Sequence, residues 1–152
     1  MAQSRPTGFW VLIAGGLVLN TLFVLGQVYS LIDYERTVTW GLQEPAAEIG
    51  NTGMAFNFGF AVADTVFYVP VFLAGLLGLW QRKAWGAVAL TAACGVSVYW
   101  PVMSTAAAQF GQGQAGFGYP SPIAYLPLTL PSFVYGVWGM WYLHTHRSEL
   151  FD

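Results

Sequence analysis

The sequence predicts an all-α integral membrane protein: a bundle of four transmembrane helices joined by short loops, with both termini in the cytoplasm. Three observations predict this class. Only 8% of the 152 residues are charged and 56% are hydrophobic, whereas a soluble domain has about 25% charged residues. Four apolar segments reach the roughly 20 residues that a membrane-spanning helix needs. The 7 tryptophans and 8 tyrosines are typical of a protein anchored at two lipid–water interfaces.

The first two predicted spans lie at about 8–30 and 54–80. The first belongs to an uncharged run at 6–32. That run is too long for the apolar part of a signal peptide, and no small-x-small cleavage site follows it. We therefore expect a first span that is retained. The second span contains Asp64 and ends just before a pair of basic residues.

The third and fourth predicted spans lie at about 85–106 and 122–143. They share an unbroken stretch at 84–146 that contains no Asp, Glu, Lys or Arg, which is long enough for two spans and a connection. A Gly- and Gln-rich segment at 109–118 divides it. Because no hydrophilic segment is large enough to fold alone, residues 1–152 are interpreted as a single transmembrane domain.

The basic residues predict the orientation. With the N-terminus in the cytoplasm, Arg5, Arg82, Lys83 and Arg147 lie inside and only Arg36 lies outside. Basic residues concentrate on the cytoplasmic side of membrane proteins, so this distribution places both termini there. The predicted location is a multi-pass position in a plasma membrane or a bacterial inner membrane.

Asp64 is the most informative single residue, because it lies in the middle of an apolar span that has no other formal charge. An acid at the centre of a membrane helix costs about 2.5–3.5 kcal/mol on insertion scales and usually marks a functional site. No Lys, Arg or His lies within the spans, so we expect Asp64 to be largely neutral near pH 7. The competing interpretation is a protonated Asp64 that only donates a hydrogen bond inside the bundle.

Other polar residues in the spans share helix faces or lie at similar depth. At 1.5 Å per residue, several of them come within about two turns of Asp64. The predicted ligand-binding residues are therefore Asp64, Asn20, Gln27, Asn57, Tyr68, Ser97 and Thr129. Ser132 lies at a similar level. The alternative is that all except Asp64 serve only as interhelical hydrogen bonds, worth about 0.6–2 kcal/mol each.

Prolines predict where the helices bend. Each proline inside a helix lacks an N–H and frees the carbonyl four residues earlier. The four prolines within or near the ends of the later spans are Pro70, Pro101, Pro127 and Pro131. Three of them fall in the outer half of the chain's spans, which favours a kinked vestibule that opens outward above Asp64. A well-packed bundle without a cavity is the alternative.

Three functions fit these features. The first is binding of a lipophilic or amphiphilic ligand in an outward-facing pocket centred on Asp64. The second is a structural or accessory subunit of a membrane complex or homo-oligomer, which the short loops and the small residues on the helices favour. The third is proton or ion translocation through an oligomer, with Asp64 as the relay.

Several other activities find no support in the sequence. No catalytic motif is present, which favours a protein that is not an enzyme, and no catalytic residue is assigned. Glu44 and Glu48 are interpreted as solvated carboxylates, and no metal site is predicted. The net charge of −2 and the lack of a basic patch argue against nucleic acid as a partner. The sequence identifies no cofactor; the expected partners are the lipid bilayer, a lipophilic small molecule and further membrane subunits.

Overall fold

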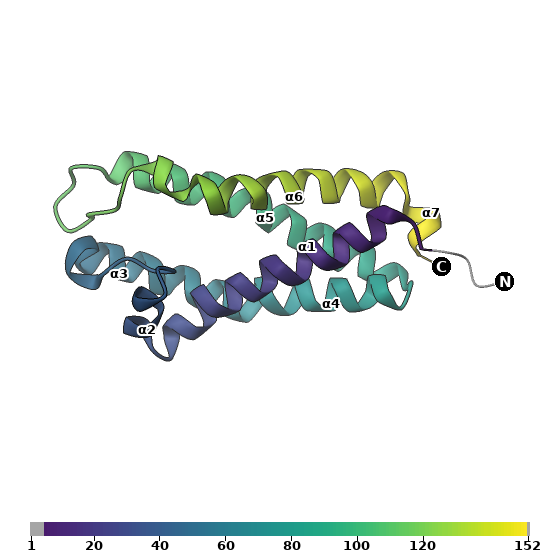
Figure 1. Cartoon of the computed structure of the whole chain (residues 1–152), viewed down its shortest axis with the longest axis horizontal. Helices are drawn as coiled ribbons and strands as arrows, with labels where there is room; N and C mark the ends of the chain where they lie inside the picture. The colour runs from purple at the N-terminus through teal and green to yellow at the C-terminus, as the bar shows by residue number, and fades with distance from the viewer. Residues whose placement is uncertain (1–4, 152) are drawn as a thin grey trace.

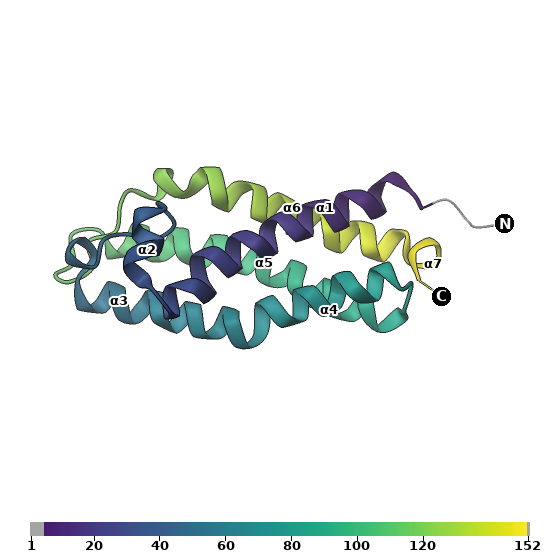
Figure 2. The ribbon, with the colours of Figure 1, turned by 60° about the horizontal axis from the view of Figure 1, so that its bottom comes forward.

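The computed structural model describes residues 5–151; residues 1–4 and 152, which the predicted domain includes, lie outside this range. Within it, every regular element is helical, which confirms the all-α class. Four segments are long and apolar enough to cross a membrane: Thr7–Leu31, Ala46–Trp80, Ala84–Gly111 and Pro122–Thr145. They run side by side along the long axis of the molecule (Figures 1 and 2).

The first two long segments are each interrupted by a π-helical turn. The first consists of α1 (Thr7–Phe23), the π-helix η1 (Val24–Val28) and the 3₁₀-helix η2 (Tyr29–Leu31). The second consists of α3 (Ala46–Ala63), the π-helix η3 (Asp64–Tyr68) and α4 (Val69–Trp80). The two π-helical turns contact each other. Such turns are rare and occur frequently at functional sites, and the apolar pattern of the sequence does not predict them.

The other two long segments pack against each other as an antiparallel pair. The third segment is α5 (Ala84–Gly111), and the fourth consists of η4 (Pro122–Tyr125) and α6 (Leu126–Thr145). α5 continues past the predicted end at about 106, where Ala107, Ala108 and Gln109 follow; alanine and glutamine favour helix. The 112–121 connection, which contains no regular helix, joins α5 to η4.

Two short helices lie outside these segments. α2 (Tyr34–Thr39) begins after Asp33, whose side chain accepts a hydrogen bond of 3.0 Å from the Arg36 N–H; a carboxylate is a favourable cap at this position. α7 (Arg147–Leu150) ends the described chain.

α3 begins with a separate turn and then kinks at Gly50, which has a φ of 67°. A Cβ at Gly50 would lie 2.9 Å from the Cα of Gly116, so both the backbone conformation and the close approach require glycine. The Gly53 N–H donates to the Gly116 carbonyl at 3.3 Å, and the Gly118 N–H donates to the Ile49 carbonyl at 3.4 Å. These contacts hold the 112–121 connection against α3.

At the opposite end of the molecule, α4 and α5 approach very closely. A Cβ at Gly75 would lie 2.7 Å from the backbone nitrogen of Leu90, so only glycine fits there without displacing α5. Leu79 and Leu90 are fully buried beside this contact. α4 and α5 are therefore tightly packed at this end, whereas a cavity lies where α3 and α5 face each other at the other end.

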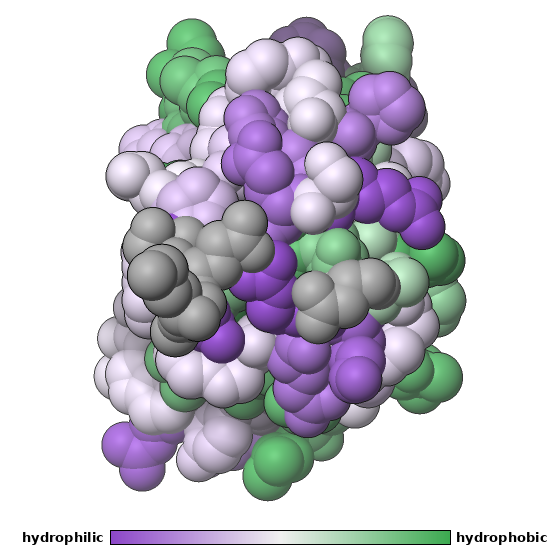
Figure 3. Space-filling view, turned by 90° about the vertical axis from the view of Figure 1, so that its right-hand side faces the viewer, coloured by the Kyte–Doolittle hydropathy of each residue, from purple (hydrophilic) through white to green (hydrophobic). Residues whose placement is uncertain are grey.

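Both ends of the described chain lie at this tightly packed end (Figure 1). Arg5 donates to the Trp80 carbonyl at 2.9 Å, and its guanidinium lies 4.2 Å from the centroid of the Trp80 ring. Arg82 donates to the Glu149 carbonyl at 2.9 Å. Figure 3 shows hydrophilic residues across this face and apolar residues at its rim. Arg36, in α2, lies at the far end.

The sides of the long segments are apolar and uncovered. Val66 is 73% exposed and Val88 is 68% exposed, and many Leu, Phe and Trp side chains are similarly open. A soluble protein rarely exposes apolar patches on this scale, whereas lipid is a suitable environment for them. The four candidate spans and their apolar sides fit a multi-pass membrane protein.

Candidate ligand-binding cavity

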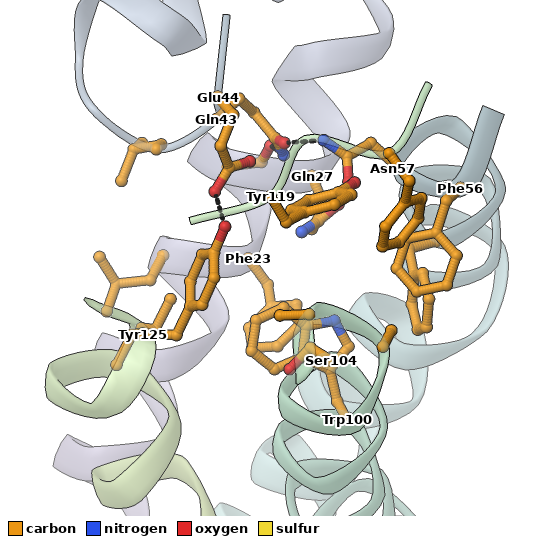
Figure 4. Close-up of a pocket in the computed structure, with 18 residues that line it drawn as sticks. Phe23, Gln27, Gln43, Glu44, Phe56, Asn57, Trp100, Ser104, Tyr119 and Tyr125 are labelled. Atoms are coloured by element: carbon orange, nitrogen blue, oxygen red, sulfur yellow. Dashed lines mark hydrogen bonds between the residues drawn. The ribbon is translucent and has the colours of Figure 1, made fainter. Parts of the chain in front are cut away.

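A cavity of about 110 Å³ lies between α3 and α5, at the end of the molecule that carries α2. Its walls come from η1, from the segment before α3, from α3, from α5, and from the 112–121 connection and the start of the fourth long segment (Figure 4). Its aromatic lining residues are Phe23, Phe56, Phe60, Trp100, Phe117, Tyr119 and Tyr125. Its polar lining residues are Gln27, Gln43, Glu44, Asn57 and Ser104.

Helical spacing explains why these side chains meet. Phe56 and Phe60 are four residues apart and so share one face of α3. Trp100 and Ser104 share a face of α5 in the same way, and Ala107 and Ala108 continue that face with side chains too small to fill the space. Large rings on one helix therefore face small residues on another, which leaves the cavity open.

The aromatic rings form two groups around the cavity. Phe56 lies edge-on to Phe60 at 4.8 Å and to Phe117 at 5.8 Å between ring centroids, and Phe117 lies 4.6 Å from Tyr119. On the other side, Phe23 and Trp100 are 5.2 Å apart and T-shaped. Aromatic pairs in these geometries stabilise by about 0.5–1.5 kcal/mol beyond their burial. The 112–121 connection thus contributes rings that complete the wall begun by α3.

A hydrogen-bond network holds together the wall of the cavity that contains Gln43 and Asn57. Asn57 donates to Gln43 Oε1 at 2.8 Å and to the Tyr34 hydroxyl oxygen at 3.1 Å. Gln43 donates to the Gly26 carbonyl at 2.8 Å, and the Tyr119 hydroxyl donates to Asn57 Oδ1. Through Asn57 and Gln43 the network joins η1, α2, α3 and the 112–121 connection, which are distant in sequence.

The electrostatics of this wall favour neutral tyrosines. Burial raises the pKa of Tyr34 above its ordinary value of 10.0, and the nearby Glu44 carboxylate adds to the rise, while the hydrogen bond from Asn57 opposes it. Burial also raises the pKa of Tyr119, with a smaller contribution from Glu44. Both hydroxyls therefore remain hydrogen-bond donors at neutral pH.

Glu44 is the only carboxylate among the residues that line the cavity. Its Oε1 accepts a hydrogen bond from the Tyr125 hydroxyl, and its backbone carbonyl accepts one of 2.9 Å from Tyr34. The side chain is half-buried, and within residues 5–151 no basic side chain forms an ion pair with it. The carboxylate thus faces the cavity with hydrogen bonding but without a counter-ion.

Gln27 reaches the cavity from η1 (Figure 4). Its Oε1 is buried and has no hydrogen-bond partner among the described residues. A buried polar atom without a partner costs about 1–3 kcal/mol. Gln27 therefore offers an amide group that a bound molecule or a water molecule in the cavity would satisfy.

Of the seven predicted ligand-binding residues, two line the cavity and three form hydrogen bonds outside it. Gln27 and Asn57 line the cavity. Tyr68 and Ser97 instead hydrogen-bond to each other at 2.7 Å in the core and do not line it. Thr129 donates to the Tyr125 carbonyl of its own segment at 2.9 Å. The sequence predicted one shared site for them, and the structure divides them between a cavity and interhelical or local contacts.

Asp64 and Asn20 do not line this cavity, and the pocket centred on Asp64 stays a prediction. Each is only 3% exposed, and Asp64 Oδ2 and both amide atoms of Asn20 have no partner within the described residues. Asp64 lies one turn beyond Phe60, the cavity residue nearest to it along α3. The rings of Phe23 and Tyr68 pack at 4.5 Å between centroids, and the cavity lies on the α2 side of Asp64.

Sequence reasoning missed most of the residues that form the cavity. Gln43, Glu44 and Tyr125 lie outside the central parts of the predicted spans. A polar residue in such a position does not by itself indicate a functional site. The available signal was the aromatic, uncharged segment around the 112–121 connection, because an exposed loop of that composition is unusual.

Comparison with protein-family models, curated proteins and solved structures found no match to the chain. The functional argument therefore rests on the residues of the cavity and on the apolar exterior.

Proposed function

We propose that this chain is a multi-pass membrane protein that binds a lipophilic or amphiphilic small molecule in the cavity between α3 and α5. The observation that carries the proposal is the composition of the cavity: seven aromatic side chains surround a few polar groups, one of which is the unpaired amide oxygen of Gln27. Small-molecule sites typically combine a mainly apolar lining with a small number of placed polar groups.

The size of the cavity supports a bound group rather than a packing defect. A volume of about 110 Å³ approaches the roughly 150 Å³ of an engineered cavity that holds benzene. The ring or head group of a ligand fits such a space, and the rest of an amphiphile would extend through the opening. A bound molecule would also offset the cost of the unpaired Gln27 oxygen.

The proposed orientation places the cavity on the outer side of the membrane. Arg5 and Arg82 lie at the end opposite the cavity, together with Lys83 and Arg147. The positive-inside rule assigns that end to the cytoplasm. The cavity then opens toward the outer leaflet of a plasma membrane or a bacterial inner membrane.

Native mass spectrometry of the full chain, released from its source membrane, tests the proposal. Ala107→Trp places a ring in the cavity, whereas Ala106→Trp adds the same ring next to it on a residue that does not line the cavity. We expect a discrete small-molecule adduct on the wild type and on Ala106→Trp, and its loss from Ala107→Trp. An adduct that persists on Ala107→Trp, or no adduct on any form, would contradict the proposal.

A second function, that of a subunit in a homo-oligomer or membrane complex, is favoured by one surface feature. Ala55, Gly59 and Ala63 are four residues apart on the exposed face of α3, and a Cβ at Gly59 would meet no atom within 4 Å. Small residues at this spacing allow membrane helices to associate closely. If this face is an interface, Gly59→Ile shifts the particle to a smaller mass in native membranes; an unchanged mass would exclude it.

A further inference from the structure

We propose that the ligand of this cavity is a cation, namely a lipophilic amine or a quaternary ammonium compound whose head group lies against Glu44. This inference rests on the proposed function and adds the chemical class of the ligand. Glu44, Tyr125 and the rings of Phe56, Phe117 and Tyr119 carry it.

The first argument is the uncompensated charge of Glu44. Charged groups that leave bulk water are normally paired, yet the half-buried Glu44 carboxylate has only the Tyr125 hydroxyl as a side-chain partner within residues 5–151. Arg36 is the one basic residue of the described chain at this end, and it forms no ion pair with Glu44. A cation in the cavity would supply the missing counter-charge.

The second argument is the ring surface around the cavity. Phe117 lies 4.6 Å from Tyr119 and 5.8 Å from Phe56 between ring centroids, so the three rings form one continuous wall. Aromatic faces attract ammonium groups by about 0.5–2 kcal/mol each, and cages of such rings are a known means of binding quaternary ammonium. A carboxylate beside an aromatic wall selects for positive charge on an apolar body.

The third argument is the excess of acidic residues at the end of the molecule that contains the cavity. Asp33, Glu35, Glu44 and Glu48 lie there with Arg36 as the single base. An excess of acids around a recess raises the local concentration of cations and their rate of entry. Below Glu44 the cavity is lined by Phe23, Trp100 and other apolar side chains, so a hydrated inorganic cation fits poorly and an organic cation fits well.

A matched pair of probes tests the inference. Decyltrimethylammonium and decyldimethylamine N-oxide have the same chain and similar head groups, but only the first carries a net positive charge. Dissociation constants are measured by native mass spectrometry on the full chain in maltoside micelles. We expect the wild type to bind the cation at least tenfold more tightly than the N-oxide.

Two variants locate the effect. Glu44→Gln removes the charge but keeps a group that accepts from Tyr125, so it is expected to lose the preference for the cation and still bind the N-oxide. Glu48→Gln removes one charge from an exposed residue that does not line the cavity; because solvent screens that charge, it is expected to keep most of the preference. Retained N-oxide binding also shows that each variant is folded.

The outcomes separate this inference from the proposed function. Equal binding of the two probes to the wild type, or an equal loss of preference in Glu48→Gln, would overturn the cation assignment while the cavity still binds amphiphiles. If neither probe binds the wild type more tightly than it binds the cavity-filled Ala107→Trp variant, the proposed function fails as well.

Discussion

The Ser132 hydroxyl donates a hydrogen bond of 3.1 Å to the carbonyl oxygen of Ser97, which is the carbonyl that Pro101 leaves without its usual donor in α5. Both serines are fully buried. In a lipid environment a freed carbonyl must find a partner within the protein, and a neighbouring helix provides it. The carbonyl that Pro101 frees in α5 is therefore satisfied by α6.

Ser97 also connects α5 to the second long segment. Its own hydroxyl donates to the Ala93 carbonyl at 3.0 Å, and a serine hydroxyl has only one proton. The 2.7 Å hydrogen bond to Tyr68 must then be donated by the tyrosine. One serine thus joins three helical segments just beneath the cavity, which gives the cavity a rigid base.

Loss of the Ser132 hydroxyl is expected to destabilise the protein. Ser132→Ala leaves the Ser97 carbonyl unpaired and should lower the free energy of unfolding by about 1 kcal/mol. Ser148→Ala, which removes the same group from an exposed residue, should have no measurable effect. Unfolding by SDS in mixed micelles measures both, and an equal effect of the two substitutions would contradict the role given to Ser132.

The close approach of α4 and α5 predicts a steric effect at Gly75. Gly75→Ala forces a methyl group against the Leu90 backbone and should cost about 1–3 kcal/mol of unfolding free energy. Gly95→Ala adds the same methyl group to α5 at a position with no atom within 4 Å of the new Cβ, so it should be neutral or slightly stabilising. Thermal unfolding of the two variants side by side is the measurement; similar melting temperatures would show that α4 and α5 are not this close.

Because one carboxyl oxygen of Asp64 is unpaired, we expect that replacing Asp64 by an apolar residue stabilises the protein. Asp64→Leu eliminates a buried polar atom without a partner and should raise the free energy of unfolding by about 1 kcal/mol or more. Asn57→Leu, by contrast, breaks the network with Gln43, Tyr34 and Tyr119 and should lower it. If Asp64→Leu destabilises the purified protein, the carboxyl group has a stabilising partner, and the account of Asp64 as an unpaired acid is contradicted.

The tyrosines near the cavity predict a loss of stability at high pH. The pKa of Tyr34 is raised by burial above the 10.0 expected of an exposed tyrosine, so the folded state favours the protonated form. The resulting contribution is complete below pH 10 and disappears as the pH rises through the folded-state pKa. Unfolding free energies between pH 8 and 11 should therefore fall more steeply for the wild type than for Tyr34→Phe; parallel curves would contradict this account.

Cysteine labelling tests the proposed orientation. The single native cysteine, Cys94, is fully buried and should not react, which makes introduced cysteines unique. Gln114→Cys lies on the 112–121 connection and Ser148→Cys lies at the end with the basic residues, and both native side chains are exposed. In intact cells a membrane-impermeant maleimide should modify Gln114→Cys only. Modification of Ser148→Cys instead would reverse the orientation.

Much of the fold follows from local sequence features. The long apolar runs and the near absence of charge predicted an all-helical chain with four helices able to cross a membrane, and the structure confirms this. The two π-helical turns and the kink at Gly50 were not predictable, because apolar periodicity does not distinguish an α-helical turn from a π-helical turn. The candidate site was predicted only in part: Gln27 and Asn57 line the cavity, but Asp64 does not.

There is a physical reason why the sequence predicted the helices but only part of the candidate site. Length, hydropathy and the placement of basic residues are properties of each segment alone, so the number of candidate spans and the expected orientation could be derived without knowing how the helices pack. The position of the cavity depends on which side chains face one another across segments distant in the chain. The rings of Phe23 and Tyr68 pack against each other, whereas Ala107 and Ala108 leave room opposite Phe56 and Phe60. The position of the candidate site, beneath Glu44 and not around Asp64, therefore follows only from how the helices pack.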